Sequence, residues 1–260
     1  MAVSAKILWL ISMISLCPLL LPDAKAQSNE LRLAVASNFA ATLKELREDF
    51  KLKTRRSFSI SQASTGKLYA QIVHGAPYDI FMAADSKRPE LLAEQGLAFE
   101  PVVYGRGQLT LVIKKTPSVN CADPVLSVLN KKNFNKLAVA SAKTAPYGVA
   151  AEEFIRAADK WNELEPSLVR GESVLQAFHY LESANADAGL IASSLLTESD
   201  GQLSGRYCQW QIPLQSYRSL EQKMVILKNT NKLALARLFS EYLKSEGAKA
   251  IIKSNGYLVD

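Results

Sequence analysis

Apolar runs and helix-spaced apolar residues alternate along most of this chain. The run Leu31–Ala36 is apolar apart from Arg32, which indicates a buried strand. Behind it, Leu43, Leu46 and Phe50 recur at the spacing of one helix face. The pattern therefore predicts a strand that runs directly into a helix.

The same strand-then-helix unit recurs down the chain. Repeated units of this kind predict α/β architecture, with a mostly parallel sheet flanked by helices. The further predicted strands are Phe58–Ser61, Asp79–Ala83, Gln108–Ile113, Leu137–Ala140, Ala188–Ala192 and Lys223–Leu227. The further predicted helices include one around Leu68 and Ile72, one opening at Pro89, one with Ala150, Phe154, Ala157 and Trp161 on one face, one around Val174, Phe178 and Leu181, and Leu233–Ser245.

The predicted units form two groups of similar size. No low-complexity linker separates them, and 260 residues are enough for two hydrophobic cores. We expect the chain to cross between two lobes near Tyr104–Leu109 and again near Tyr217–Met224. Lobe 1 is predicted to contain residues 27–107 and 218–260, and lobe 2 residues 108–217.

The first 26 residues have the layout of a secretory signal peptide. Lys6 precedes the apolar run Ile7–Leu21, and Ala24-Lys25-Ala26 is a small-x-small cleavage site. A membrane anchor is the alternative, but the apolar run is short and prolines interrupt its end. We therefore expect cleavage after Ala26, export to the periplasm and a mature protein without a membrane-spanning segment.

Composition is that of a soluble globular protein, with 48% hydrophobic and 22% charged residues. The net charge is +6 for the whole chain. The leader carries Lys6, Lys25 and Asp23, a net +1, so +5 remains in the mature chain. The basic residues are scattered and no aromatic-interleaved basic stripe occurs, which argues against nucleic acid as a partner.

The cysteines and histidines indicate no metal or cofactor site. The mature chain has Cys121 and Cys208, and a disulfide between them is compatible with an oxidising compartment. Sequence alone does not show that these two residues are close. His74 and His179 are far apart along the chain and are interpreted as structural or surface residues.

Small polar residues stand at four predicted helix starts, within Ala36–Phe39, Ser64–Lys67, Ala145–Gly148 and Gly171–Val174. A helix N-terminus has unpaired N–H groups and a partial positive charge, so it attracts anions. In α/β sheets such loops lie at the carboxyl ends of strands, where ligands bind. Ordinary helix capping is the simpler alternative for any one of these loops.

Other classes of protein are less well supported by the residues. Ser37 and Thr65 could serve as nucleophiles, but no histidine–aspartate pattern and no Gly-x-Ser-x-Gly motif accompanies them. A membrane-bound sensor would need a spanning segment after residue 26, and none is predicted. The residues alone thus predict a two-lobed α/β protein, not an enzyme, whose helix starts suit an anion.

Several segments closely resemble the periplasmic molybdate-binding proteins of ABC importers, the ModA family. The resemblance covers nearly all of the mature chain and keeps the order and spacing of the segments. They are Ala34–Phe39, Ser64–Ile72, Gly75–Asp85, Tyr104–Gly107, Thr144–Gly148 and Ile251–Leu258.

The resemblance implies a type II periplasmic binding-protein fold, with two lobes joined by two hinge strands and closing on the ligand. It also implies molybdate or tungstate as ligand, no cofactor, a monomer, and an ABC transporter permease with its ATPase as partners. The ligand positions implied by the family are Ser37, Asn38, Thr65, Tyr147 and Val174. Some members have a tyrosine donor where this chain has Ala192, so the site must be completed otherwise, with Asn38 as one candidate.

The donor character of these positions bears on which anion is bound. Molybdate, tungstate and sulfate are unprotonated near neutral pH and accept hydrogen bonds only, whereas hydrogenphosphate also needs an acceptor. None of the implied positions is acidic, and Asp79 and Asp85 are interpreted as structural or hinge residues because a carboxylate would repel a dianion. Sulfate, thiosulfate or another tetrahedral oxyanion stays the alternative ligand.

Overall fold

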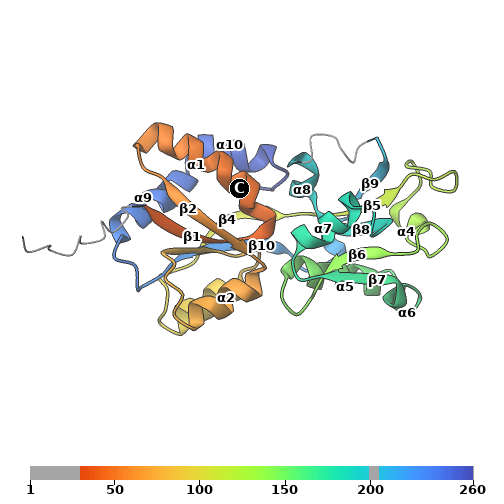
Figure 1. Cartoon of the computed structure of the whole chain (residues 1–260), viewed down its shortest axis with the longest axis horizontal. Helices are drawn as coiled ribbons and strands as arrows, with labels where there is room; N and C mark the ends of the chain where they lie inside the picture. The colour runs from red at the N-terminus through yellow and green to blue at the C-terminus, as the bar shows by residue number, and fades with distance from the viewer. Residues whose placement is uncertain (1–29, 199–204, 260) are drawn as a thin grey trace, which may run out of the picture.

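The structure, a computed structural model, describes residues 30–198 and 205–259. Figure 1 shows two lobes side by side, each built on one sheet with helices packed against it. Each sheet has five strands, in the orders β2-β1-β3-β10-β4 and β7-β6-β8-β5-β9. The mostly parallel two-lobed α/β architecture expected from the sequence is confirmed.

The first lobe contains both ends of the described chain. Strand β10 runs antiparallel to its neighbours β3 and β4, while β1, β2 and β3 are mutually parallel. The strands are β1 Leu31–Ala36, β2 Phe58–Ala63, β3 Ile80–Met82, β4 Val102–Gly107 and β10 Leu220–Ile226. The helices are η1 Ser37–Phe39, α1 Ala40–Thr54, α2 Thr65–Val73, α3 Lys87–Glu94, α9 Leu233–Leu243 and α10 Glu246–Ser254.

The second lobe repeats this plan. Strand β5 is antiparallel to β8 and β9, while β6, β7 and β8 are parallel. The strands are β5 Leu109–Lys114, β6 Leu137–Ala140, β7 Leu168–Gly171, β8 Ala188–Ala192 and β9 Tyr207–Gln211. The helices are α4 Val125–Val128, α5 Pro146–Ala157, α6 Trp161–Leu164, η2 Glu165–Ser167, α7 Val174–Glu182, α8 Ser193–Glu198 and η3 Leu214–Ser216.

The chain passes between the two sheets twice. Gln108 alone separates β4 from β5, and residues 212–219 connect β9 to β10. The reversed strand of each sheet, β5 or β10, is therefore the one that enters from the other lobe. These sheet boundaries do not define which residues would move together as one rigid lobe. The lobe limits at residues 107 and 217 therefore stay a prediction.

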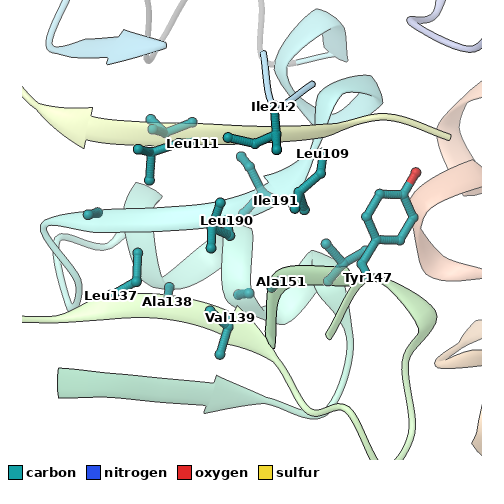
Figure 2. Packing of buried hydrophobic residues seen from close by; sticks show 14 of the residues in the cluster. Leu109, Leu111, Leu137, Ala138, Val139, Tyr147, Ala151, Leu190, Ile191 and Ile212 are labelled. Atoms are coloured by element: carbon teal, nitrogen blue, oxygen red, sulfur yellow. The ribbon is translucent and has the colours of Figure 1, made fainter. Parts of the chain in front are cut away.

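Apolar packing explains the stability of each lobe. In lobe 1, the rings of Phe50 and Phe58 lie 5.5 and 5.0 Å from that of Phe239, beneath α1 and α9. In lobe 2, Figure 2 shows Leu111 of β5 and Leu190 of β8 packed in the same cluster as other strand and helix residues. Burial of such side chains contributes about 1.5–3 kcal/mol each.

One predicted helix is wrong in its extent. The apolar face drawn from Ala150 to Trp161 belongs to two helices, because α5 ends at Ala157 and α6 begins at Trp161. Asp159 between them has a φ of 55°, a left-handed conformation that no α-helix can continue through. The Trp161 ring still packs back on α5, with the Arg156 guanidinium 3.7 Å from its centroid.

A disulfide ties two segments of lobe 2 together. Cys121, which precedes α4, is bonded to Cys208 of β9, and their Cα atoms are 5.1 Å apart. This is the pairing that the sequence left open. Within residues 30–198 and 205–259, no helix is long and apolar enough to span a membrane. The predicted leader lies outside the described residues.

Candidate functional site

The sequence-predicted ligand residues stand at the starts of four helical segments that follow strands. Ser37 begins η1 after β1, and Thr65 is the first residue of α2 after β2. Tyr147 is the second residue of α5, and Val174 is the first residue of α7. All of these side chains are buried, as is that of Asn38.

Hydrogen bonds between the lobes bring three of the helix starts together. The Gly66 N–H of α2 donates to the Thr144 carbonyl at 2.8 Å, in the loop before α5. The Thr144 hydroxyl in turn donates to the Glu172 carbonyl at 2.8 Å, in the loop before α7. Lys67 pairs with the Glu172 carboxylate across the same boundary. The structure therefore describes the lobes in contact, with the predicted loops facing one another.

The start of η1 lies against the same boundary. Ala36 and Ala84 of lobe 1 belong to the buried apolar cluster that also contains Tyr147 and Val174 of lobe 2. On the first lobe, the Ala84 N–H donates to the Thr65 hydroxyl oxygen at 3.2 Å. Residues from both lobes thus pack together at this boundary.

Two glycines permit the close approach of these loops. A Cβ on Gly148 would lie 2.4 Å from the Ala140 carbonyl oxygen, so α5 can start this close to β6 only with glycine there. A Cβ on Gly66 would lie 3.0 Å from the Thr144 carbonyl oxygen, across the lobe boundary. Both close approaches therefore require glycine, while the N–H groups of Gly66 and Gly148 are themselves bonded to the carbonyls of Thr144 and Ala145.

The site is rich in hydrogen-bond donors. Helices α2 and α5 have no side-chain cap among the described residues, so their first N–H groups are not satisfied in that way. Because the Thr65 oxygen accepts from Ala84, its own hydrogen is left to donate elsewhere. The Ser64 hydroxyl is buried with no partner in the described part of the chain.

Sequence reasoning singled out Thr65 and missed Ser64 as a donor. Serine before a helix is the commonest kind of cap, so its sequence position carried no separate signal. In the structure the Ser64 hydroxyl does not cap α2, and this marks it, within the described residues, as a free donor that the sequence could not reveal.

The two aspartates interpreted from the sequence as structural or hinge residues are both engaged within the protein. Asp79 is fully buried and accepts hydrogen bonds from the Arg32 N–H at 2.7 Å and the Thr230 hydroxyl at 2.8 Å. Its carboxylate also lies 3.4 Å from the Lys232 ammonium. Burial alone would raise the pKa of Asp79, but these bonds and charges outweigh it and lower the pKa. Asp85 pairs with Arg88 at the start of α3.

Asn38 uses its side chain inside the protein. Its amide nitrogen donates to the Gln222 side-chain oxygen and to the Tyr257 hydroxyl, both at 3.0 Å. The backbone carbonyl of Asn38 accepts from the hydroxyls of Tyr257 at 2.6 Å and Ser194 at 3.1 Å. With both amide hydrogens used, the backbone N–H is the donor left for a ligand, and that role stays a prediction.

Ala192 stands at the position where some members of the family have a tyrosine donor. Ala192 is the last residue of β8 and is fully buried. Two residues later, Ser194 of lobe 2 bonds to Asn38 of lobe 1, which links the end of β8 to η1. Ala192 itself brings no side-chain donor.

Sequence analysis also missed the polar residues behind the site. Tyr104 and Gln222 lie on neighbouring strands and hydrogen-bond each other at 2.9 Å, in full burial. Burial raises the pKa of Tyr104 well above its usual value, so it stays a neutral phenol. Polar residues in strands form no distinctive sequence pattern. They become visible only when the structure shows that they are buried.

No metal centre is assembled by the described residues, where no group of three His, Cys, Asp or Glu side chains could hold an ion. His74 and His179 are both exposed and belong to different lobes.

The chain is similar to known bacterial proteins over almost its whole length. The profile of the family "Bacterial extracellular solute-binding protein" matches residues 31–258. The molybdate-binding protein ModA of Azotobacter vinelandii is 35% identical over 234 residues, 89% of this chain and 91% of the relative. The molybdate-binding protein ModA of Rhodobacter capsulatus is 32% identical over 237 residues, 90% of each chain.

Solved structures of binding proteins are also similar to this chain. The periplasmic molybdate-binding protein of Azotobacter vinelandii has a TM-score of 0.81 and 33% identity, and the match covers 89% of this chain and 100% of that one. The sulfate-binding protein SubI of Mycobacterium tuberculosis has a TM-score of 0.73 at 11% identity, over 89% of this chain and 87% of that one, which shows the shared fold alone. With a matching profile from residue 31 to 258 and relatives above 30% identity, the chain belongs to the family of bacterial extracellular solute-binding proteins.

Proposed function

We propose that this chain captures molybdate or tungstate outside the cytoplasm and delivers it to an ABC importer. The observation that carries the proposal is the meeting of helix starts from both lobes through Gly66, Thr144 and Glu172. A buried set of N–H and O–H donors can replace the water shell of an unprotonated dianion. The relatives named as molybdate-binding proteins support this choice of anion.

In this proposal the donors come from both lobes. Ser37 and Thr65 donate from hydroxyl and backbone N–H groups, and Asn38 from its backbone. Tyr147 and Val174 donate backbone N–H groups at the starts of α5 and α7. The unpartnered hydroxyl of Ser64 supports its inclusion as a further donor.

Closure follows from the division of donors between lobes. An anion on Ser37 and Thr65 in an open molecule gains the N–H groups of Tyr147 and Val174 only when the lobes meet. Contacts made in the closed form alone favour that form. The Gly66–Thr144 hydrogen bond and the Lys67–Glu172 pair are two such contacts within the protein.

Calorimetry on anion-stripped protein tests the ligand. Molybdate, tungstate, sulfate, thiosulfate and phosphate are titrated separately into the mature chain. The proposal expects tight binding of molybdate and tungstate and little or no response to the others. Tight sulfate or thiosulfate binding with no molybdate response would overturn it.

The remaining parts of the proposal concern the context of the protein. We propose that residues 1–26 are removed by cleavage after Ala26, that the mature chain works as a periplasmic monomer, and that its closed form docks on a permease coupled to an ATPase. The proposed role is capture without a catalytic step, since Ser37 and Thr65 act as donors. Mass spectrometry of the secreted protein checks the cleavage site.

A further inference from the structure

Gln222 of β10 joins the two lobes beneath the proposed anion site. It is fully buried, and its side-chain oxygen accepts from the Tyr104 hydroxyl at 2.9 Å and from the Asn38 amide at 3.0 Å. Its side-chain nitrogen donates to the Tyr147 hydroxyl at 3.4 Å. The first two partners belong to lobe 1 and the third to lobe 2.

The Tyr147 side chain reaches out of its own lobe to make this contact. Figure 2 shows its ring at the edge of the lobe 2 cluster, with the hydroxyl directed away from that cluster toward the other lobe. Its backbone N–H is one of the proposed anion donors, in the first turn of α5. The side chain and the backbone of one residue thus face two different partners, both of which depend on closure.

Gly107 makes room for this contact at the hinge. It is the last residue of β4, pairs with Leu220 of β10, and is followed by the single residue that connects to β5. A Cβ at this position would lie 2.2 Å from the Tyr147 hydroxyl oxygen and 2.6 Å from the Gln222 side-chain nitrogen. Any side chain here would occupy the place where the lobes meet.

We propose that Gln222 is a positioning residue that couples closure at the hinge to the anion site through Tyr147, and that Gly107 is glycine because closure requires it. This inference rests on the proposed function, since it takes Tyr147 as an anion donor. When the lobes separate, the Gln222–Tyr147 bond breaks and water replaces it. When they close, the bond holds the start of α5 against lobe 1, so its N–H groups are in place for the ligand.

The test uses the mature chain with the variants Y147F, G107A and the double variant G107A/Y147F. Y147F removes the hydroxyl but keeps the backbone donor, and one lost hydrogen bond corresponds to molybdate dissociation about 3- to 10-fold faster. G107A inserts a methyl group where the hydroxyl lies, so we expect a loss of affinity of about 10-fold or more, carried mainly by the dissociation rate. The double variant removes the nearest clashing atom but leaves the Gln222 nitrogen at 2.6 Å, so it is expected to recover part of that loss.

A matched control separates positioning from general destabilisation. Y242F also removes a buried tyrosine hydroxyl, one that lies 2.8 Å from the Asp49 carboxylate and 3.2 Å from the Leu46 carbonyl, within lobe 1 and away from the hinge. We expect Y242F to lower the unfolding midpoint without changing molybdate dissociation. If Y147F and G107A change dissociation no more than Y242F does, or if the double variant shows no recovery relative to G107A, the inference is wrong.

Small-angle scattering separates this inference from the proposed function. In ligand-free protein open and closed forms are in equilibrium, and G107A is expected to remove the closed fraction and so to give a larger mean radius of gyration than the wild type, whatever anion the protein binds. If the wild type binds no molybdate while G107A is still more open, the hinge role stands and the proposed ligand fails. If the wild type binds molybdate and G107A is equally compact with equal affinity, the hinge role fails and the ligand stands.

Discussion

At the scale of single residues, Thr65 shows how a hydroxyl can serve the fold and a ligand together. Its oxygen accepts from the Ala84 N–H at 3.2 Å, which ties α2 to the segment after β3. Its hydrogen remains available for an anion. A serine could do both tasks, whereas threonine also restricts the rotamer.

The hydroxyl of Thr65 can be tested by two substitutions. T65V removes it at nearly constant volume, and we expect molybdate affinity to fall about 10- to 100-fold, as for a hydrogen bond to a charged partner. T65S keeps it and is expected to stay within about 3-fold of wild type. Calorimetry gives both values, and equal losses in the two variants would contradict a role for the hydroxyl.

Ser64 offers a sharper comparison, because Thr42, in the first turn of α1, has the same local property but is not one of the proposed ligand positions. Both hydroxyls are buried and lack partners among the described residues. Replacing an unsatisfied buried hydroxyl removes a cost of about 1–3 kcal/mol, so S64A and T42V are expected to unfold no more easily than wild type without ligand.

With molybdate the two variants should differ. S64A is expected to lose about 10-fold in affinity, as one donor to a charged ligand is removed, while T42V keeps wild-type affinity. Thermal unfolding with and without molybdate measures both effects. Equal ligand-induced stabilisation in S64A and T42V would exclude Ser64 from the site.

Asp79 predicts a dependence of stability on pH. Its pKa is lowered in the folded protein, so the stability that it contributes is complete above the unfolded-state pKa of about 3.9 and is lost as the pH falls toward the lowered value. D79N leaves Lys232 without its buried partner and is expected to cost about 3 kcal/mol at neutral pH.

Urea unfolding at neutral pH and near pH 3 measures the effect of Asp79. The difference between D79N and wild type should shrink at the acid end, because Asp79 of the unfolded wild type takes up a proton there more readily than the folded form with its lowered pKa. A difference that is constant with pH would mean that the charge of Asp79 contributes nothing.

At the scale of elements, continuous apolar runs were predictable and mixed ones were not. β1, β6 and β8 are uniformly apolar or nearly so, and each was expected within a residue or two of its limits. β4 carries two glycines and an arginine, and β7 is four residues long with only Gly171 buried, so neither shows a strand period. Their place depends on partners distant in sequence.

The disulfide is an element-scale constraint with a measurable contribution. Cys121 and Cys208 are 87 residues apart in sequence, so the bond restricts a long loop of the unfolded chain. The double variant C121S/C208S is expected to unfold with about 2–4 kcal/mol less free energy and unchanged molybdate affinity, because the bond lies away from the site. Denaturant titration and calorimetry check this, and a loss of affinity without a loss of stability would contradict it.

At the scale of the whole molecule, the proposed site draws its donors from both lobes. The ligand positions were obtained from a family resemblance over nearly the whole chain, and their helix starts had a local signal. The Gln222 network had none, because its members Asn38, Tyr104, Tyr147 and Tyr257 come from four separate elements or segments. Only the three-dimensional arrangement reveals that they meet.

Closure itself is expected to be visible in solution. Molybdate added to anion-stripped protein should reduce the radius of gyration, because the interlobe contacts at Gly66 and Lys67 form only when the lobes meet. The Lys67–Glu172 pair is exposed and contributes less than about 1 kcal/mol, so raising the salt concentration should weaken closure only slightly. Scattering profiles that are identical with and without molybdate would argue against a closing mechanism.

The place of β10 in its sheet has a consequence for the order of assembly. In the sheet it lies between β3 and β4, although in the sequence all of β5–β9 comes between β4 and β10. The N-terminal sheet therefore has a gap until residues 220–226 arrive, while the lobe formed by β5–β9 needs no later strand. During synthesis from the N-terminus, the chain can therefore complete the sheet of lobe 2 before the sheet of lobe 1. The N-terminal strands β1–β4 are then the last to become resistant to unfolding or proteolysis.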